Sequence, residues 1–212
     1  MKKLTLITTL MASAMSFSSH AATTSATVNI TGKIVPASCS ITANANGGTI
    51  DFGNILTSEL TSGKKTLTKE DSLSVSCDKA TTAAIKISGG NGATSAAFAT
   101  NKDYARFIIG LTQVSPTGGT ATDTLMVSKA STIDLSDIAA ASFTKGLAAS
   151  QAFPASGNYF TVADSSDQIG TFQTLTVNYK VYASIDSEKA KAAASAGADT
   201  FDGQAIFELN YL

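Results

Sequence analysis

The stretch TLTVNYKVY, residues 174–182, alternates apolar and polar side chains at every second position. This period of two predicts a β-strand that is buried on one face, because successive side chains of a strand point to opposite sides of the sheet. Similar or more continuously apolar segments occur along most of the chain. The expected strands are 26–34, 49–53, 72–77, 83–88, 107–111, 174–182 and 204–212, the last with Ala205, Phe207, Leu209 and Tyr211 on one face.

Glycine, asparagine and serine punctuate these strands, as in Gly47-Gly48 and Gly89-Gly90. The chain contains no tryptophan, and charged residues make up 15% of it. Short strands joined by such turns predict an all-β antiparallel sandwich in one domain. Two alanine-rich stretches, 134–151 and 187–196, are expected to hold short helices within loops. In the second stretch, Asp186 or Ser187 would cap the helix and Gly197 would end it.

The first residues have the three-part pattern of a secretory signal peptide. Lys2-Lys3 precede an uncharged, mostly apolar run from Leu4 to Phe17, and Ser19-His20-Ala21 places small residues where a signal peptidase cleaves. We therefore expect a signal peptide over 1–21, with an uncleaved anchor as the alternative. The apolar run is shorter than the roughly 20 residues of a membrane span, and no later segment approaches that length.

Two cysteines, Cys39 and Cys77, remain after cleavage. An even number of cysteines in an exported chain predicts a disulfide. Closing the loop between them would stabilise the fold by about 4 kcal/mol in the chain-entropy model. A metal pair or a catalytic thiol would need partners such as histidine, and the one histidine, His20, lies in the predicted signal peptide.

Composition also argues against several functions. Without a histidine in the mature chain, a serine hydrolase would lack its usual base, and no motif marks a Ser–Lys pair. No spacing of acidic residues marks the pair of carboxylates that a glycosidase would need. Nucleic-acid binding has little support, since Arg106 is the single arginine and no basic patch accompanies it. We expect a protein that is not an enzyme and that needs no cofactor or metal.

Several motifs resemble those of the chaperone–usher pilins, which are the subunits of bacterial fimbriae. Gly32 to Cys39 (GKIVPASC) is similar to the first pilin strand, where a glycine and apolar residues precede the first cysteine. Ile50 to Ile55 is similar to a short pilin strand, and Leu73 to Cys77 to the strand that carries the second cysteine. Tyr211 is the penultimate residue of an alternating strand, as in the C-terminal signature of pilins.

The chain looks closer still to an uncharacterised family of exported, pilin-like proteins carried as a domain of unknown function. Members share a Gly-x-Ile-x-Pro-x-x-Cys start, a Gly-Gly turn before an Asp-aromatic-Gly strand, and an Asp-Gly before a strand that ends in Tyr-Leu. Here these motifs are 32–39, 47–53 and 202–212. The middle of the chain, about 93–166, resembles neither family.

The resemblance implies an incomplete immunoglobulin-like (pilin-type) sandwich over 32–212 that lacks its final strand. An N-terminal extension, 22–31, would donate that strand to the next subunit, with Ala26, Val28 and Ile30 filling its groove. Phe207, Leu209 and Tyr211 would border the groove and dock the chaperone, the Tyr211 ring lying in the core and its hydroxyl at the rim. The implied partners are a periplasmic chaperone, an outer-membrane usher and other pilin subunits. The implied place is a fimbrium at the cell surface, reached through the periplasm, with a role in cell adhesion.

One other interpretation remains open, and a second is not expected to apply. The segment 22–31 could be the first strand of its own sandwich, which would make the protein a self-complemented, soluble periplasmic or secreted binding protein. A tip adhesin would place a lectin domain before the pilin domain and would need a longer chain. Whether Ala22 to Thr31 pairs within its own subunit or outside it separates the first interpretation from a fimbrial subunit.

Overall fold

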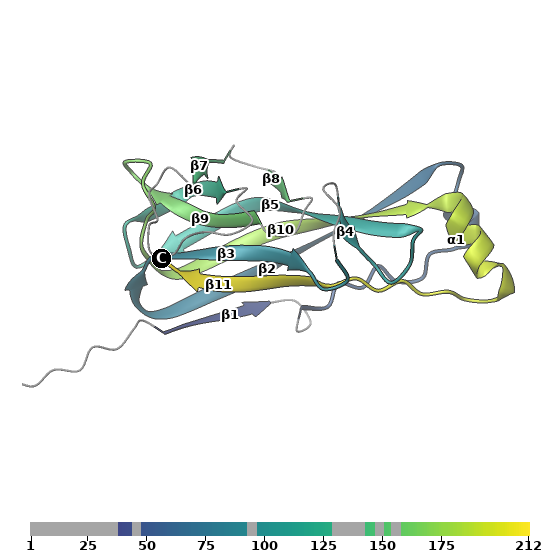
Figure 1. Cartoon of the computed structure of the whole chain (residues 1–212), viewed down its shortest axis with the longest axis horizontal. Helices are drawn as coiled ribbons and strands as arrows, with labels where there is room; N and C mark the ends of the chain where they lie inside the picture. The colour runs from purple at the N-terminus through teal and green to yellow at the C-terminus, as the bar shows by residue number, and fades with distance from the viewer. Residues whose placement is uncertain (1–37, 44–47, 93–96, 129–142, 147–150, 154–157) are drawn as a thin grey trace, which may run out of the picture. The chain divides into compact units, whose positions relative to one another are not determined.

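Two antiparallel sheets enclose the hydrophobic core in the computed structural model (Figure 1). The structure describes residues 38–43, 48–92, 97–128, 143–146, 151–153 and 158–212. All described elements belong to one unit, Pro36–Leu212. The strands are β1 (Cys39–Ala43), β2 (Lys64–Thr81), β3 (Ala83–Gly89), β4 (Phe98–Ala99), β5 (Ala105–Thr117), β6 (Ala121–Ser128), β7 (Thr144–Lys145), β8 (Gln151–Phe153), β9 (Asn158–Asp164), β10 (Phe172–Asp186) and β11 (Ala205–Tyr211). One short α-helix, α1 (Ser187–Ala193), follows β10.

The first sheet has the strand order β1-β2-β10-β5-β4, and β8 also pairs with β5. The second sheet has the order β11-β3-β9-β6-β7. Every pair of described strands is antiparallel, and β10 lies between two strands that are far from it in sequence. The predicted class, an all-β antiparallel sandwich with a short helix in a loop, is therefore confirmed.

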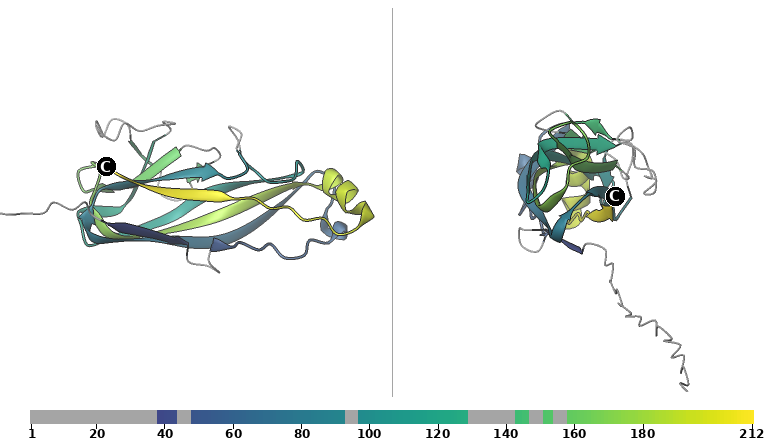
Figure 2. Two further views of the ribbon diagram at one scale, coloured as in Figure 1. Left: turned by 60° about the horizontal axis from the view of Figure 1, so that its bottom comes forward. Right: turned by 90° about the vertical axis from the view of Figure 1, so that its left-hand side faces the viewer.

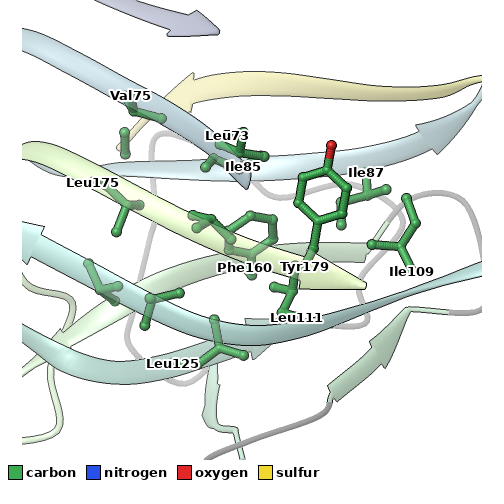
Figure 3. Close-up of a cluster of buried hydrophobic side chains, with 14 of the residues drawn as sticks. Leu73, Val75, Ile85, Ile87, Ile109, Leu111, Leu125, Phe160, Leu175 and Tyr179 are labelled. Carbon is green, nitrogen blue, oxygen red and sulfur yellow. The ribbon is translucent and has the colours of Figure 1, made fainter. Parts of the chain in front are cut away.

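The core is built from alternate residues of both sheets, as the pattern of the sequence requires. Along β10, Leu175, Val177, Tyr179, Val181, Ala183 and Ile185 are all buried, and the residues between them are partly exposed. The second sheet supplies Ile85, Ile87, Phe160 and Val162 to the same cluster (Figure 3). Phe160 is 0% exposed, so the centre of this sheet is fully covered.

Five predicted strands are confirmed within β2, β3, β5, β10 and β11. The strand predicted at 49–53 is wrong, because no residue of that segment pairs in a sheet. Its Asp51 carboxylate accepts a hydrogen bond from Gly53 N–H (2.7 Å), and Gly53 has a φ of 70°. A side chain that captures a nearby amide favours a turn over a strand. Ile50 and Phe52 nevertheless pack against the core.

The helix predicted at 187–196 is confirmed as α1 followed by a 3₁₀ turn at Ala194–Ala196. Asp186 caps it, since its side chain accepts a hydrogen bond from Lys189 N–H. Gly197, with a φ of 144°, follows the last turn. In the other alanine-rich stretch, the described residues Thr144–Lys145 form β7, so the expected helix is absent there, and most of that stretch lies outside the described residues.

The predicted disulfide between Cys39 and Cys77 is confirmed. It joins two residues that face each other in the β1–β2 pair and so fastens the edge strand β1 to the first sheet. The predicted signal peptide, 1–21, and the predicted donor extension, 22–31, lie outside the described residues. The same holds for the strand expected at 26–34 and for most of the motif at 32–39.

Candidate functional site: a groove between two sheet edges

Strand β11 forms one edge of the second sheet. It pairs with β3 through the register Ala205↔Gly89 to Tyr211↔Ala83, and no described strand pairs with its other side. The side chains of Ala205, Phe207 and Leu209 are half-buried and pack against the core. The face predicted from the alternation is therefore correct, but these residues are less buried than their counterparts in β10.

Strand β1 forms the facing edge, in the first sheet. It pairs with β2 from Cys39↔Cys77 to Ala43↔Leu73, and no described strand pairs with its other side. Its odd residues, Cys39, Ile41 and Ala43, are half-buried, whereas Ser40 and Thr42 are exposed. Both edges lie on the same side of the sandwich (Figure 2, left).

The hydrogen bonds at the two ends of β11 show which of its residues bond to β3. Gly90 N–H donates to the Gln204 carbonyl (2.9 Å), and Leu212 N–H donates to the Thr82 carbonyl (3.1 Å). In an antiparallel pair, residues bonded to the partner alternate with residues whose N–H and C=O groups point away from it. The even-numbered residues of β11 thus bond to β3. Its odd-numbered residues direct their N–H and C=O groups to the side away from β3, and the side chains of Ala205, Phe207 and Leu209 turn toward the core.

The same reasoning shows which residues of β1 bond to β2. Asp78 N–H donates to the Ser38 carbonyl (3.0 Å), which places the even-numbered residues in the bonded set. Cys39, Ile41 and Ala43 therefore direct their N–H and C=O groups away from β2. Two sheet edges of matching character, apolar and with backbone groups that no described strand pairs, thus flank the same space, and such edges are templates for an added strand.

A groove of about 1230 Å³ runs between these edges. Its floor comes from the inner face of the first sheet and includes Leu73, Ile109, Tyr179 and Val181. One wall contains Ile41, Ala43, Ile50 and Phe52, and the other contains Ala205 and Phe207. The groove offers apolar contacts along its length together with backbone donors and acceptors at both rims, which suits an extended peptide segment.

The Tyr179 hydroxyl provides a buried polar group within the floor. It donates a hydrogen bond to Asp71 Oδ2 (3.0 Å), which lies opposite it on β2. Burial, followed by the negative charge of Asp71, raises the pKa of Tyr179, so the phenol stays neutral at physiological pH. Its ring packs against Phe207 with the centroids 5.5 Å apart. Tyr179 therefore connects the floor to the β11 wall.

Near α1, polar contacts hold the segment that precedes β11, which contains Asp199 and Phe201. Asp199 accepts from Lys102 Nζ at 2.6 Å and from the Tyr104 hydroxyl at 3.0 Å. The hydrogen bond from Lys102 holds the pKa of Asp199 below its ordinary value, and burial together with Asp199 raises the pKa of Tyr104 to about 12. The Tyr104 ring also meets Phe201 edge-on. This clamp holds the segment before β11 against the 100–104 loop.

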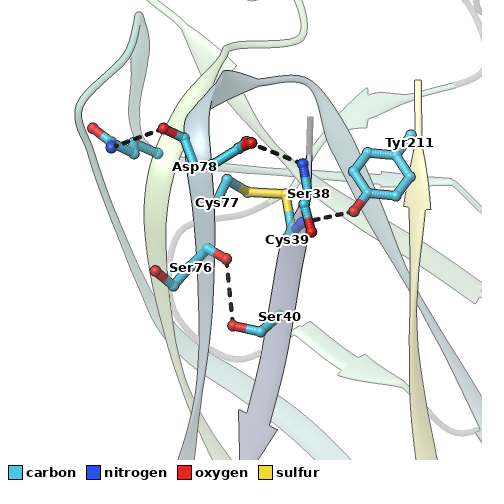
Figure 4. The surroundings of a disulfide bond; sticks show 8 residues. Ser38, Cys39, Ser40, Ser76, Cys77, Asp78 and Tyr211 are labelled. Atoms are coloured by element: carbon cyan, nitrogen blue, oxygen red, sulfur yellow. Dashed lines mark hydrogen bonds between the residues drawn. A yellow bond between two sulfur atoms is a disulfide. The ribbon is translucent and has the colours of Figure 1, made fainter. Parts of the chain in front are cut away.

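At the other end, Tyr211 spans from β11 to β1 (Figure 4). Its hydroxyl accepts a hydrogen bond from Cys39 N–H at 2.8 Å, beside the disulfide. The side chain is 43% exposed, so the expectation that its ring lies in the core is wrong. Because Tyr211 belongs to an edge strand at the end of the sheet, no further described strand covers it.

The structure thus places Phe207 in the groove, whereas Leu209 and Tyr211 lie further along the same edge strand, toward the disulfide and beyond the residues that line the groove. Ala26, Val28 and Ile30 lie outside the described residues, and their donor role remains a prediction. Sequence reasoning missed Ile41, Ala43 and Tyr179 as groove residues. The alternation CSITA at 39–43 is the signal that would have identified β1 as the second edge.

Among the described residues, no cluster of three or more His, Cys, Asp or Glu side chains is placed to hold a metal ion. None of the described helices is long and apolar enough to cross a bilayer.

Comparison with known proteins finds one family match, in the first half of the chain. Residues 23–107 match the family described as Spore Coat Protein U domain, a family of the pilin type. The match covers the motifs at 32–39 and 47–53 and both cysteines, but not β11. The resemblance to pilin-type proteins that the motifs suggested is thereby confirmed over that part of the chain.

Among solved structures, the chain is similar to the one titled "Crystal structure of the P pilus rod subunit PapA". The two share 17% sequence identity over 88% of this chain and 99% of that one, with a TM-score of 0.40. No curated protein matches the chain.

Proposed function

We propose that this protein is a structural subunit of a fimbrial fibre and that its subunits join by donor-strand complementation. In this mechanism the N-terminal segment 22–31 of one copy enters the groove between β1 and β11 of the next copy. The observation that carries the proposal is the pair of open edges whose odd-numbered residues present apolar side chains and outward backbone groups to one groove.

The alternation of the donor segment suits this groove. Ala26, Val28 and Ile30 fall on one face of an extended strand, and Thr27 and Asn29 fall on the other. Fully burying a valine or isoleucine side chain is worth about 1.5–3 kcal/mol. Backbone hydrogen bonds to both rims would add to this and would satisfy groups that otherwise face water.

The geometry of such a contact supports a fibre. The donor segment lies at one end of the sequence and the groove is formed by other residues, so the contact between copies is head-to-tail and does not use the same surface twice. Head-to-tail contacts that do not close into a ring generate open filaments. Export through the periplasm, a chaperone that occupies the groove before assembly, an usher in the outer membrane and a role in adhesion belong to the same proposal.

The test compares two single substitutions on opposite faces of the donor segment. The full-length chain is produced in cells that export and assemble it, and material sheared from the surface is run on an unheated SDS gel. We expect a ladder of multimers that collapses to one band on boiling. Val28→Asp should abolish the ladder because it places a charge in the groove, whereas the matched control Asn29→Asp should retain it.

A different result would favour the self-complemented alternative. If the wild-type chain ran as a single monomer band in the periplasm of cells shown to express it, the donor segment would be filling its own groove. Val28→Asp would then lower the thermal stability of the monomer and leave its oligomeric state unchanged.

A further inference from the structure

The Tyr211 hydroxyl accepts a hydrogen bond from a backbone N–H on the edge of β1 that no described strand pairs. Cys39 belongs to the residues whose N–H groups point away from β2, toward the groove side. Its N–H donates to the Tyr211 hydroxyl at 2.8 Å. The outward amides of Ile41 and Ala43 are therefore the ones that an added strand can use without displacing a bond of the fold.

Both ends of this contact are anchored. On the β1 side, Cys39 is fixed by the disulfide to Cys77, and the neighbouring Ser38 N–H donates to Asp78 Oδ1 at 3.0 Å (Figure 4). On the β11 side, the next residue, Leu212, donates its N–H to the Thr82 carbonyl (3.1 Å) and accepts from the Thr82 hydroxyl (3.0 Å). The Tyr211 side chain thus bridges strands β11 and β1 just beyond the residues that line the groove, and it is anchored on both strands.

A strand inserted between β1 and β11 would meet the Tyr211 side chain. To extend past Leu209 toward the disulfide, it must break the bond between Tyr211 and Cys39 and move the ring aside. A strand can slip by two residues and still present the same face, so alternation alone does not choose among such registers. A fixed stop at one end of the groove removes one direction of slippage.

We propose that Tyr211 is a positioning residue that closes the disulfide end of the groove and sets the register of the strand that fills it. This inference rests on the proposed donor-strand function and adds a specific role for one hydroxyl group. The occupant is the 22–31 segment of a second copy, whose side chains at 26, 28 and 30 repeat every two residues and so permit slipped registers.

The register is read by cysteine pairs in the full-length, exported chain. One copy carries Val28→Cys, and the other carries Ala205→Cys, Phe207→Cys or Leu209→Cys. Cross-linked peptides are identified by mass spectrometry, with the native disulfide as an internal check. In the wild-type background we expect one position on β11 to dominate as the partner of residue 28.

The decisive background is Tyr211→Phe, which keeps the ring and removes the hydroxyl. A net hydrogen bond of about 1 kcal/mol corresponds to a factor of about five in a population ratio. We therefore expect the ratio of the dominant cross-link to the one shifted by two residues to fall about fivefold. Tyr182→Phe, on the outer face of β10, is the matched control and should leave the ratio unchanged.

Each outcome has a distinct meaning. An unchanged cross-link distribution in Tyr211→Phe, with a normal ladder, would overturn the positioning role and leave donor-strand assembly intact. No intermolecular cross-link and no ladder in any background would overturn the donor-strand proposal itself. Thermal unfolding of each variant, together with the Cys39–Cys77 bond, verifies that the fold persists, so a shifted register is not confused with an unfolded chain.

Discussion

Strands β10 and β11 carry similar alternations of apolar residues, but their inward side chains are buried to different extents in the sandwich. β10 has a neighbour on each side, and its inward residues are at most 7% exposed from Leu175 to Ile185. β11 has one described neighbour, and Phe207 and Leu209 remain half-buried while Tyr211 is 43% exposed. Alternation reports which face of a strand turns inward, whereas completeness of burial depends on how many strands flank it.

The largest expected effect is on the free energy of unfolding, when one phenylalanine is truncated at the centre of a sheet and another on the edge strand β11. Phe160, in β9 between β3 and β6, is 0% exposed, and truncating it to alanine should cost about 3–5 kcal/mol through lost burial and a cavity. Phe207→Ala should cost less, about 1–2 kcal/mol, because part of its side chain already faces water. Denaturant unfolding of a chain lacking residues 22–31 measures both. Equal losses would mean that the groove side is as closed in the monomer as the centre of the sheet.

A second substitution tests how the groove wall approaches the core. A Cβ added at Gly203, just before β11, would lie 2.5 Å from Phe107 Cε1 and 3.0 Å from its Cδ1. Because Phe107 is buried, the clash is not easily relieved, and we expect Gly203→Ala to destabilise the fold by about 1–3 kcal/mol. The measurement is again denaturant unfolding.

Gly53→Ala separates this contact from backbone strain. Gly53 has a φ of 70°, but nothing lies within 4 Å of its added Cβ, so conformation alone should cost about 1 kcal/mol there. If Gly203→Ala proved harmless, β11 would approach the core less closely than the structure indicates.

The smallest expected effect concerns pH and the clamp on the segment before β11. The hydrogen bond from Lys102 lowers the pKa of Asp199 from its ordinary 3.8, so this carboxylate stabilises the fold above that value. The contribution is lost as pH falls through the lowered folded pKa, because the carboxyl group then becomes protonated in both states.

The stabilising difference between the wild-type chain and Asp199→Asn should therefore shrink as the solution is acidified from about pH 6 to about pH 2. Thermal midpoints across that range provide the measurement, with Asp123→Asn on β6 as the control for general charge effects. A difference independent of pH would show that the clamp acts through packing and not through the charge.

Much of the fold was predictable because it depends on local chemistry. Alternation located five strands, the Asp186 cap and Gly197 bounded the helix, and an even cysteine count indicated the disulfide. The error at 49–53 arose because Asp51 captures the Gly53 amide, a local competition that the apolar pattern does not reveal. The face of β11 was also predictable, which placed Phe207 and Leu209 correctly toward the core.

The sequence by itself thus determined the class of the fold, the inward face of β11 from Ala205 to Leu209 and the covalent bond between Cys39 and Cys77. These follow from the period of side chains along a strand and from the pairing of thiols. The tertiary structure alone decided that β1 and β11 are, among the described strands, edges of two different sheets and that both border one groove. It also decided that the Tyr211 hydroxyl meets Cys39 N–H across that groove. These features depend on which strands become neighbours, a consequence of long-range packing that no local pattern of residues encodes.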